Sequence, residues 1–296
     1  METFEHEGLP IRYVRAGCGE PVVCLHDGGA SPAIWSELAT ALAPDYEVFA
    51  LDLLGAGATL ERSVAILGAF VDARALAPVR LVGNGMGSAA ALALASRRPR
   101  DVAALVLSNP LTAATLTAGR LGPWLRLHER APRLARALHA RRFAARRALR
   151  FQLGSAGRAR RVHEDPELLA SYTSAGWIAS LLGALDDRAS YEALDRLAPG
   201  PEFPPLCTIW GLDNRVLAPS AGRVLNQRLR PQREEWLEDC GHLPMRESPE
   251  RVTATVRAFF AGVPRRRVLP VPVSAARHGS TIERPAPAGQ PAKQRV

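Results

Sequence analysis

The stretch Pro78–Arg97, PVRLVGNGMGSAAALALASR, decides how the rest of this chain is interpreted. A short apolar run of strand character ends at Val82, and five residues rich in glycine follow from Gly83 to Gly87. From Met86 onward the chain is rich in Ala and Leu, which have high helix propensity. This succession predicts a strand that turns sharply into a helix.

Strand, glycine-rich turn and helix are also the setting of the G-x-S-x-G nucleophile elbow. The outer glycines of that pattern are Gly83 and Gly87, so the central position, where the pattern has its serine, is Gly85. Phosphate-binding loops share such a turn, but a dinucleotide fingerprint would need glycine where Ser88 stands, and a P-loop would need a lysine. The sequence therefore predicts the frame of an elbow without its nucleophile.

Length and composition limit the class of protein. The chain has 296 residues, 47% of them hydrophobic, which is enough for one large core with a smaller appendage. No uncharged apolar run reaches about 18 residues, and the acidic start METFEHEGLP lacks a signal region. The four cysteines lack metal-ligand spacing and are interpreted as reduced thiols. We therefore expect a cytoplasmic protein with no membrane span, no metal and no other cofactor.

The net charge is +9, and nearly all of the positive charge is arginine, concentrated between Arg120 and Arg161 and in the C-terminal tail. A nucleic-acid site would need aromatic residues or a known motif beside this charge, and neither is present, so we expect no nucleic-acid partner. A solvated basic face is the favoured interpretation, and weak contact with an anionic surface is the alternative. The oligomeric state is not indicated.

Strand and helix patterns alternate through residues 1–110. The expected strands are two edge strands within 3–16, and 21–26, 46–51, the run that ends at 82, and 102–107. Ser31 followed by Pro32, and Thr59, are predicted helix N-caps. This alternation predicts an α/β fold with a mostly parallel central sheet and helices on both faces.

The pattern changes after residue 110. Residues 111–197 have helical spacing throughout, which predicts an inserted helical cap. Strands are expected again at 206–210 and 235–237, and a helix over 249–260 closes the fold. The predicted organisation is a core in two parts, 1–110 and 198–263, a cap over 111–197, and a disordered Pro/Arg-rich tail over 264–296.

Two further segments add polar residues at strand ends. Asp213 ends the segment WGLD after one predicted strand, and His242 lies in GHLP after the next. Elbow, acid and histidine in this chain order match the α/β hydrolases. Over about residues 1–263 the chain resembles the α/β-hydrolase superfamily, in particular its cap-bearing esterase, lactonase and epoxide-hydrolase branches. The segments LHDGG, LVGNGMG, IWGLD and CGHLPMRESP carry this resemblance.

The resemblance implies a role for each matching residue. It makes His242 the general base and Asp213 the acid that orients the imidazole. Gly28 and Met86 would supply the backbone N–H groups of an oxyanion hole. The implied ligand is a small, mainly apolar molecule that the cap and the sheet enclose.

Two residues depart from the family pattern. Gly85 has no side chain that could attack a substrate, and Asp27 replaces a glycine beside the expected oxyanion hole. If the Asp27 carboxylate points inward it would oppose a developing oxyanion, and otherwise it serves only as a substitute for glycine, because Asp tolerates left-handed backbone. Asp27 and Asn84 are the further candidates for the lining of the site.

Three functions remain open at this stage. The first, which the sequence favours, is an enzyme without a covalent intermediate, in which His242 with Asp213 activates water or removes a substrate proton. The second is a catalytically inactive homologue that binds a small molecule or a partner. The third is a serine elsewhere that completes a triad. If Asp213, His242 and the oxyanion N–H groups are aligned, Gly85→Ser is expected to gain labelling by serine-directed probes and some activity on activated esters, and failure to gain either would favour the binder.

Overall fold

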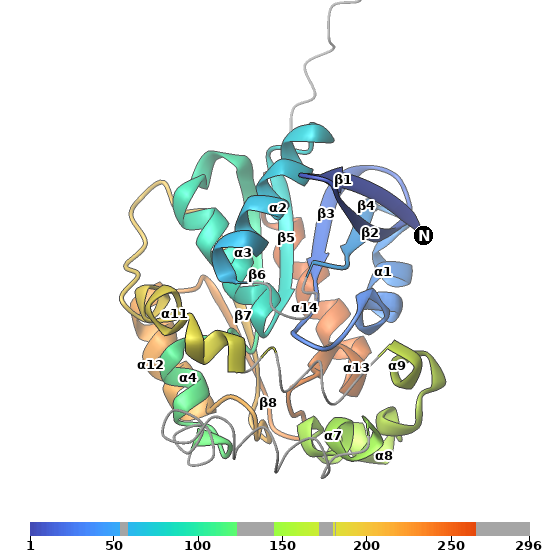
Figure 1. The fold of residues 1–296 in the computed structure, drawn as a ribbon, viewed down its shortest axis with the longest axis vertical. Coiled ribbons are helices and arrows are strands. Elements are labelled where there is room, and N and C mark those ends of the chain that lie inside the picture. The colour runs from blue at the N-terminus through green and yellow to red at the C-terminus, as the bar shows by residue number, and fades with distance from the viewer. Residues whose placement is uncertain (54–58, 123–144, 172–179, 181, 265–296) are drawn as a thin grey trace, which may run out of the picture. The chain divides into compact units, whose positions relative to one another are not determined.

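The computed structural model describes residues 1–53, 59–122, 145–171, 180 and 182–264. Its eight strands form one sheet in the order β1-β2-β4-β3-β5-β6-β7-β8 (Figure 1). The strands are β1 Glu2–His6, β2 Leu9–Ala16, β3 Glu20–Leu25, β4 Tyr46–Leu51, β5 Val79–Asn84, β6 Val102–Ser108, β7 Leu206–Gly211 and β8 Arg233–Leu237. The β1–β2 and β2–β4 pairs are antiparallel, and the other five pairs are parallel. The predicted fold class is thus confirmed.

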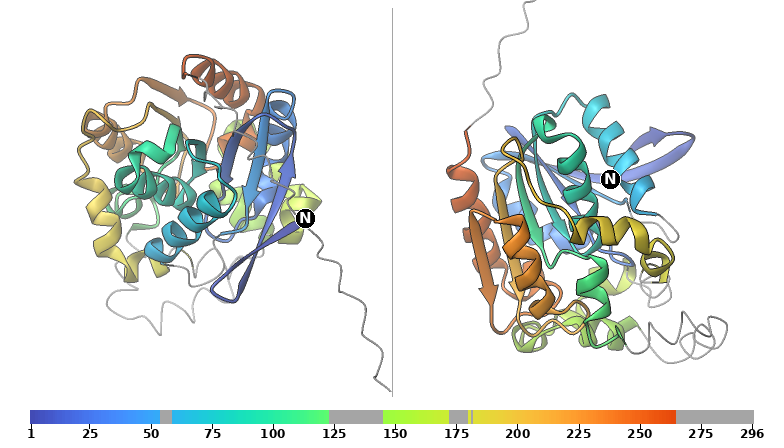
Figure 2. Two further views of the ribbon diagram at one scale, coloured as in Figure 1. Left: turned by 90° about the horizontal axis from the view of Figure 1, so that it is seen from above. Right: turned by 90° about the vertical axis from the view of Figure 1, so that its left-hand side faces the viewer.

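Helices cover both faces of this sheet. Helix α1 packs against α14 on one face, and α2 packs against α3 on the other (Figure 2). The helices of the core are η1 Pro32–Trp35, α1 Ser36–Leu42, α2 Leu60–Ala73, α3 Met86–Arg97, η2 Pro99–Asp101, α12 Pro219–Leu229, α13 Pro244–Glu247 and α14 Pro249–Ala261. The Thr59 side chain caps α2 as expected. Ser31 instead caps a 3₁₀ turn that precedes α1, and α12 was not among the expected helices.

The central strands are buried on both faces, which explains their continuous apolar runs. Every residue of β5 and β7 is buried, including Arg80 at 1% exposure. Its guanidinium lies 3.0 Å from the Glu20 carboxylate and 5.5 Å from the ring centroids of both Tyr46 and Phe260. The apolar stem and flat cation of arginine allow this burial between two aromatic rings.

Every element described between residues 111 and 197 is helical. These elements are α4 Ala113–Thr117, α7 Ala145–Gln152, α8 Ser155–Ala159, η3 Val162–Glu164, α9 Pro166–Ser171 and α11 Arg188–Asp195. Hydrogen bonds join the start of α8 to the loop after β7 and to the end of α13: the Ser155 N–H donates to Asp213 and the Gly154 N–H to Glu247. This part of the chain therefore lies at the carboxyl ends of the strands.

Parts of the predicted organisation lie outside the described residues. These parts are 123–144, 172–179 and 181 of the cap, and 265–296 of the tail. The division into core, cap and disordered tail therefore stays a prediction. Among the described helices, none is both long and apolar enough to cross a bilayer.

Candidate active site

The turn at Gly85 has the strained backbone of an elbow. Gly85 lies between β5 and α3 with φ +53° and ψ −115°, a conformation that residues with a Cβ rarely adopt. A Cβ on Gly83 would lie 2.5 Å from the Ser88 nitrogen, and one on Gly87 would lie 2.2 Å from the Leu25 carbonyl oxygen. Both outer glycines are therefore required by the close approach of α3 to its own strand and to β3.

Four loops that are far apart in the sequence meet at this edge of the sheet. Asp27 follows β3, Gly85 follows β5, Asn214 follows β7 and His242 follows β8. Since these strands are parallel neighbours or nearly so, their carboxyl ends place the four loops side by side.

The centre of the site is a buried contact between Asp27 and His242. Their exposed fractions are 2% and 0%, and His242 Nε2 lies 2.8 Å from Asp27 Oδ2. Asp27 Oδ1 accepts the Met86 N–H at 2.7 Å. A Cβ built on Gly85 would lie 2.0 Å from Asp27 Oδ1 and 2.4 Å from its Cγ. The Asp27 carboxylate thus points inward, occupies the space that a side chain at residue 85 would need, and takes up an N–H expected for the oxyanion hole.

The structure does not bring Asp213 to His242, which corrects the expected role of this carboxylate. Asp213 is 38% exposed at its side chain, accepts the Ser155 N–H at 3.2 Å and lies 3.4 Å from the Arg158 guanidinium. The next residue, Asn214, is 7% exposed and places its Nδ2 3.3 Å from His242 Nδ1. The turn after β7 directs successive side chains to different sides, so the neighbour of the predicted acid faces the imidazole.

A second histidine holds the Asp27 backbone. His26 is 1% exposed, and its Nδ1 lies 2.7 Å from the Asp27 carbonyl oxygen. Its Nε2 lies 3.3 Å from Asp52 Oδ1. The hydrogen bond from His26 lowers the pKa of Asp52 more than its partial burial raises it, and Arg12 lowers it further. Both ring nitrogens of His26 face oxygen acceptors, so His26 ties the loop after β3 to the end of β4.

Glu247 holds the loop that carries His242. Its carboxylate is 2% exposed and accepts the backbone N–H groups of Gly241 at 2.9 Å, Leu243 at 3.0 Å and Gly154 at 2.7 Å. Burial raises the pKa of Glu247, although these three hydrogen bonds act in the opposite direction. Glu247 therefore fixes both neighbours of His242 and joins them to the segment before α8.

The remaining predicted residues lie close to this pair. A Cβ on Gly28 would lie 2.5 Å from Met86 Sδ and 2.3 Å from Ser180 Cβ, so Gly28 packs directly against the start of α3. Asn84 is fully buried, and neither polar atom of its side chain has a hydrogen-bond partner among the described residues. It stands opposite Ser108 in the β5–β6 register, and the Ser108 hydroxyl likewise has no partner in the described part of the chain. These side chains form a polar layer beside the elbow.

Helix α11 carries a buried tyrosine that interacts electrostatically with Asp27. Tyr191 on α11 is 2% exposed. Burial raises the pKa of its hydroxyl, and the negative charges of Asp187 and Asp27 raise it further. The hydroxyl therefore stays neutral and protonated near the carboxylate.

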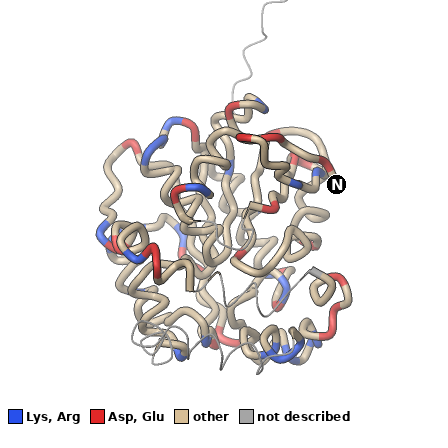
Figure 3. Tube along the Cα trace, in the orientation of Figure 1, with Lys and Arg blue, Asp and Glu red and all other residues tan. Residues whose placement is uncertain are grey.

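Most of the described arginines between residues 146 and 161 form ion pairs. Figure 3 shows basic residues gathered on α7 and α8. The ion pairs are Arg146 and Arg161 with Glu164, Arg158 with Asp213, and Arg160 with both Glu37 and Glu250. These arginines thus have acidic partners within the chain, which is consistent with a solvated surface.

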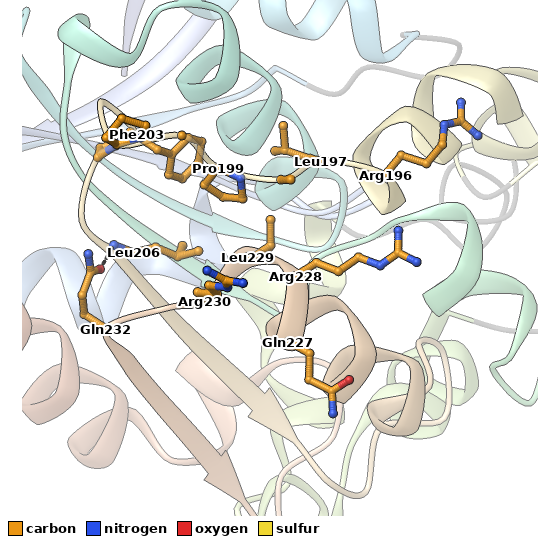
Figure 4. Close-up of a pocket in the computed structure, with 14 residues that line it drawn as sticks. Arg196, Leu197, Pro199, Phe203, Leu206, Gln227, Arg228, Leu229, Arg230 and Gln232 are labelled. Carbon is orange, nitrogen blue, oxygen red and sulfur yellow. Dashed lines mark hydrogen bonds between the residues drawn. The ribbon is translucent and has the colours of Figure 1, made fainter.

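A larger cavity lies away from the site. It has a volume of about 670 Å³ and is lined by the segment that precedes β7, which includes Arg196, and by the end of α12 with the residues after it, which include Arg228 and Arg230 (Figure 4). It reaches Leu206, the first residue of β7, whereas Asp213 and Asn214 follow the last. This groove therefore opens at the amino end of β7, opposite the Asp27–His242 pair.

The comparisons with known proteins agree with this fold. Residues 22–255 match the Alpha/beta hydrolase family, and the chain belongs to this family. It is 29% identical to Lipase LipV of Mycobacterium tuberculosis over 80% of this chain and 92% of that one. It is 33% identical to the 2-hydroxy-6-oxo-6-(2'-aminophenyl)hexa-2,4-dienoic acid hydrolase of Metapseudomonas resinovorans, but over only 44% of this chain and 46% of that relative.

Solved structures show the same fold at low identity. An alpha/beta hydrolase fold protein from Burkholderia ambifaria superposes with a TM-score of 0.68 at 22% identity, covering 86% of this chain and 96% of that one. The enol-lactonase from Burkholderia xenovorans gives 0.67 at 20% identity, covering 88% and 100%. Three of these four proteins are named as a lipase, a hydrolase and a lactonase, and the fourth only as an alpha/beta hydrolase fold protein.

Sequence reasoning missed the partners of the predicted histidine. Asp27 was considered as a residue beside the site and Asn214 was not considered, yet these two side chains contact the two ring nitrogens of His242. The available signal was the coincidence of an unusual carboxylate at residue 27 with an unusual glycine at residue 85.

Proposed function

We propose that this chain is an enzyme that performs acid–base chemistry at the Asp27–His242 pair and forms no covalent serine intermediate. The observation that carries the proposal is the position of the Asp27 carboxylate, which bonds to the Met86 N–H and to His242 and fills the space beside Gly85. A carboxylate and an imidazole in direct contact are groups that general acid–base catalysis uses. Water activation on a labile ester, elimination and isomerisation are the reactions that such a pair supports.

The proposed substrate is small and mainly apolar. Ile34, Leu149, Leu168 and Leu243 line a void of about 10 Å³ beside the residue that follows His242, together with the polar Ser31 and Gln152. A void of this volume holds no more than about one water molecule, so it gives the site an aliphatic wall and not a substrate cavity. Aliphatic walls close to a buried hydrogen-bonded pair strengthen electrostatic interactions there, since the local dielectric constant is low.

The second candidate is a non-catalytic binder, and the same hydrogen bonds favour it. The Met86 N–H and the His242 ring already have a partner in Asp27, so the pair is satisfied without any substrate. A fully satisfied buried network can serve to rigidify a core.

A panel assay separates these two candidates. Wild-type protein is assayed against activated esters, lactones and β-substituted ketones, and is treated in parallel with a fluorescent phosphonate that labels reactive serines. We expect turnover of at least one class without labelling. His242→Ala and Asp27→Asn should abolish that turnover, while Asp213→Asn, whose carboxylate faces Arg158, should retain it. Labelling of wild type at Ser180 or another serine would contradict the proposal, and a protein that binds panel compounds without turnover is the binder.

A further inference from the structure

We infer that Asn214 holds His242 in the tautomer that carries its proton on Nε2, so that the Asp27 carboxylate, rather than the imidazole, is the base of the site. This inference rests on the proposed function for its catalytic consequence and on hydrogen-bond geometry for the tautomer itself. The family resemblance implies that His242 is the general base, whereas here His242 is a hydrogen-bond donor and Asp27 is the base.

The orientation of the Asn214 amide follows from its other partners. Asn214 Oδ1 lies 2.9 Å from the Val216 nitrogen and 3.1 Å from the Leu217 nitrogen. A backbone N–H can only donate, so the atom that faces these two groups is the carbonyl oxygen. The amide NH₂ group therefore faces His242 Nδ1 at 3.3 Å. A flipped amide would place an NH₂ group against these two backbone donors.

The amide in turn determines the imidazole proton. An NH₂ group donates and does not accept, so Nδ1 must present its lone pair to Asn214. A neutral ring then carries its proton on Nε2, which donates to Asp27 Oδ2 at 2.8 Å. The backbone of His242 is held on both sides, because its backbone N–H donates to the Gln152 carbonyl at 2.7 Å and Asn109 donates to its backbone carbonyl at 3.2 Å. The ring itself is oriented by its contacts with Asn214 and Asp27.

In this tautomer His242 has no lone pair on the side of the carboxylate, so it can donate a hydrogen bond there but cannot remove a proton. Asp27 keeps acceptor capacity, because its two oxygens offer about four lone-pair sites and these two hydrogen bonds use one on each oxygen. The base of the site is therefore Asp27, and His242 and Met86 are the donors that orient it.

The chemical class follows from where the donors point. The Met86 N–H is bonded to Asp27 and does not face a substrate carbonyl, so stabilisation of an ester oxyanion has little support. On the proposed function, the unengaged lone pairs of Asp27 would accept an acidic C–H proton. That proton goes to an Asp27 oxygen, the C–H electron pair forms a C=C bond, the leaving group departs with its own electron pair, and protonated Asp27 gives the proton to the leaving group. The substrate class is a small molecule with an acidic C–H next to a carbonyl and a β-leaving group.

The tautomer is measured directly in the resting protein. The seven histidines are labelled with ¹⁵N, and His242 is assigned by the loss of its signals in His242→Gln. Long-range ¹H–¹⁵N spectra distinguish a protonated ring nitrogen from one with a lone pair. At neutral pH the expected result is a protonated Nε2 and an unprotonated Nδ1. A proton on Nδ1, in either the neutral or the cationic ring, would overturn the inference.

The variant Asn214→Asp also tests the protonation of His242, and here a proton on Nδ1 is the expected result. The carboxylate introduced at residue 214 can keep one oxygen on the Val216 and Leu217 N–H groups and turn the other towards Nδ1, so the ring should gain its second proton at neutral pH. Asn226→Asp is the matched control, because Asn226 is also buried at 3% exposure but bonds to Trp210 and Thr208 instead. The control should leave the His242 signals unchanged.

Turnover of a β-substituted ketone by Asn214→Asp tests whether Asp27 or His242 is the base. If Asp27 is the base, a cationic ring beside it weakens the base, and kcat/KM should fall about tenfold or more in Asn214→Asp. If His242 is the base, the same change completes an Asp–His pair and should raise kcat by up to about 10⁴-fold. A rise refutes the inference and leaves the proposed function standing. No turnover of any panel compound refutes the proposed function, while the spectra still decide the tautomer.

Discussion

Rebuilding a serine site requires the removal of Asp27 as well as the change at Gly85. In Gly85→Ser the new Cβ would lie 2.0 Å from Asp27 Oδ1 and 2.4 Å from Cγ, far inside any real Cβ contact. The carboxylate would have to leave, and with it the hydrogen bonds to Met86 and His242. A hydrogen bond to a charged group contributes about 1.5–3 kcal/mol, and overpacking costs about 1–3 kcal/mol. The single variant should therefore lose several kcal/mol of its free energy of unfolding, which is about 5–15 kcal/mol for a typical protein, and it should gain no reactive serine.

The double variant Asp27→Gly/Gly85→Ser removes this overlap. It frees the Met86 N–H for an oxyanion and leaves His242 Nε2 facing the new hydroxyl. We expect labelling by a serine-directed phosphonate and weak hydrolysis of activated esters. Adding Asn214→Asp should raise kcat strongly, because an amide in place of the triad carboxylate costs about 10⁴-fold through the wrong tautomer.

The assay compares the three variants by urea unfolding, probe labelling and kcat on one activated ester. The expected order of labelling is single variant lowest, double variant intermediate and triple variant highest. His242→Ala in the triple variant should return it to background. Equal labelling of the single and double variants, with unchanged stability of the single variant, would refute the reasoning, since Asp27 would then not occupy the space beside residue 85.

Other predictions concern the residues that hold the site. The contact with His26 lowers the pKa of Asp52, so it stabilises the fold above the unfolded pKa of about 3.9, and this stability is lost as the pH falls through the folded pKa. Asp52→Asn should therefore remove this pH dependence from the free energy of unfolding, measured in urea at a series of pH values. Burial raises the pKa of Glu247, so the free energy of unfolding should decrease as the pH rises through its folded pKa. Glu247→Gln should remove this decrease. The same variant should also loosen the loop that carries His242, which faster amide hydrogen exchange would report. Gly28→Ala should lower the melting temperature, because the added Cβ would overlap Met86.

Much of the fold was predictable from local signals. The apolar runs at 46–51 and 206–210, the Thr59 cap and the Gly83–Gly87 turn all lie within a few residues of the elements that they define. Such patterns depend on burial and backbone sterics, which act over short stretches of chain. The positions of Gly85 and His242 at strand ends followed from the same signals.

The partners of His242 required the tertiary structure. Asp213 and Asn214 are adjacent in the sequence, and only the conformation of the turn after β7 determines which one faces the imidazole. Asp27 and Gly85 are 58 positions apart in the chain, and only the packing of β3 beside β5 shows that the carboxylate of one fills the side-chain space of the other. Composition and spacing along the chain record neither the direction of a side chain nor the distance between loops. For this reason the sequence determined the fold and the position of His242 at a strand end, and the tertiary structure decided which side chains contact its ring.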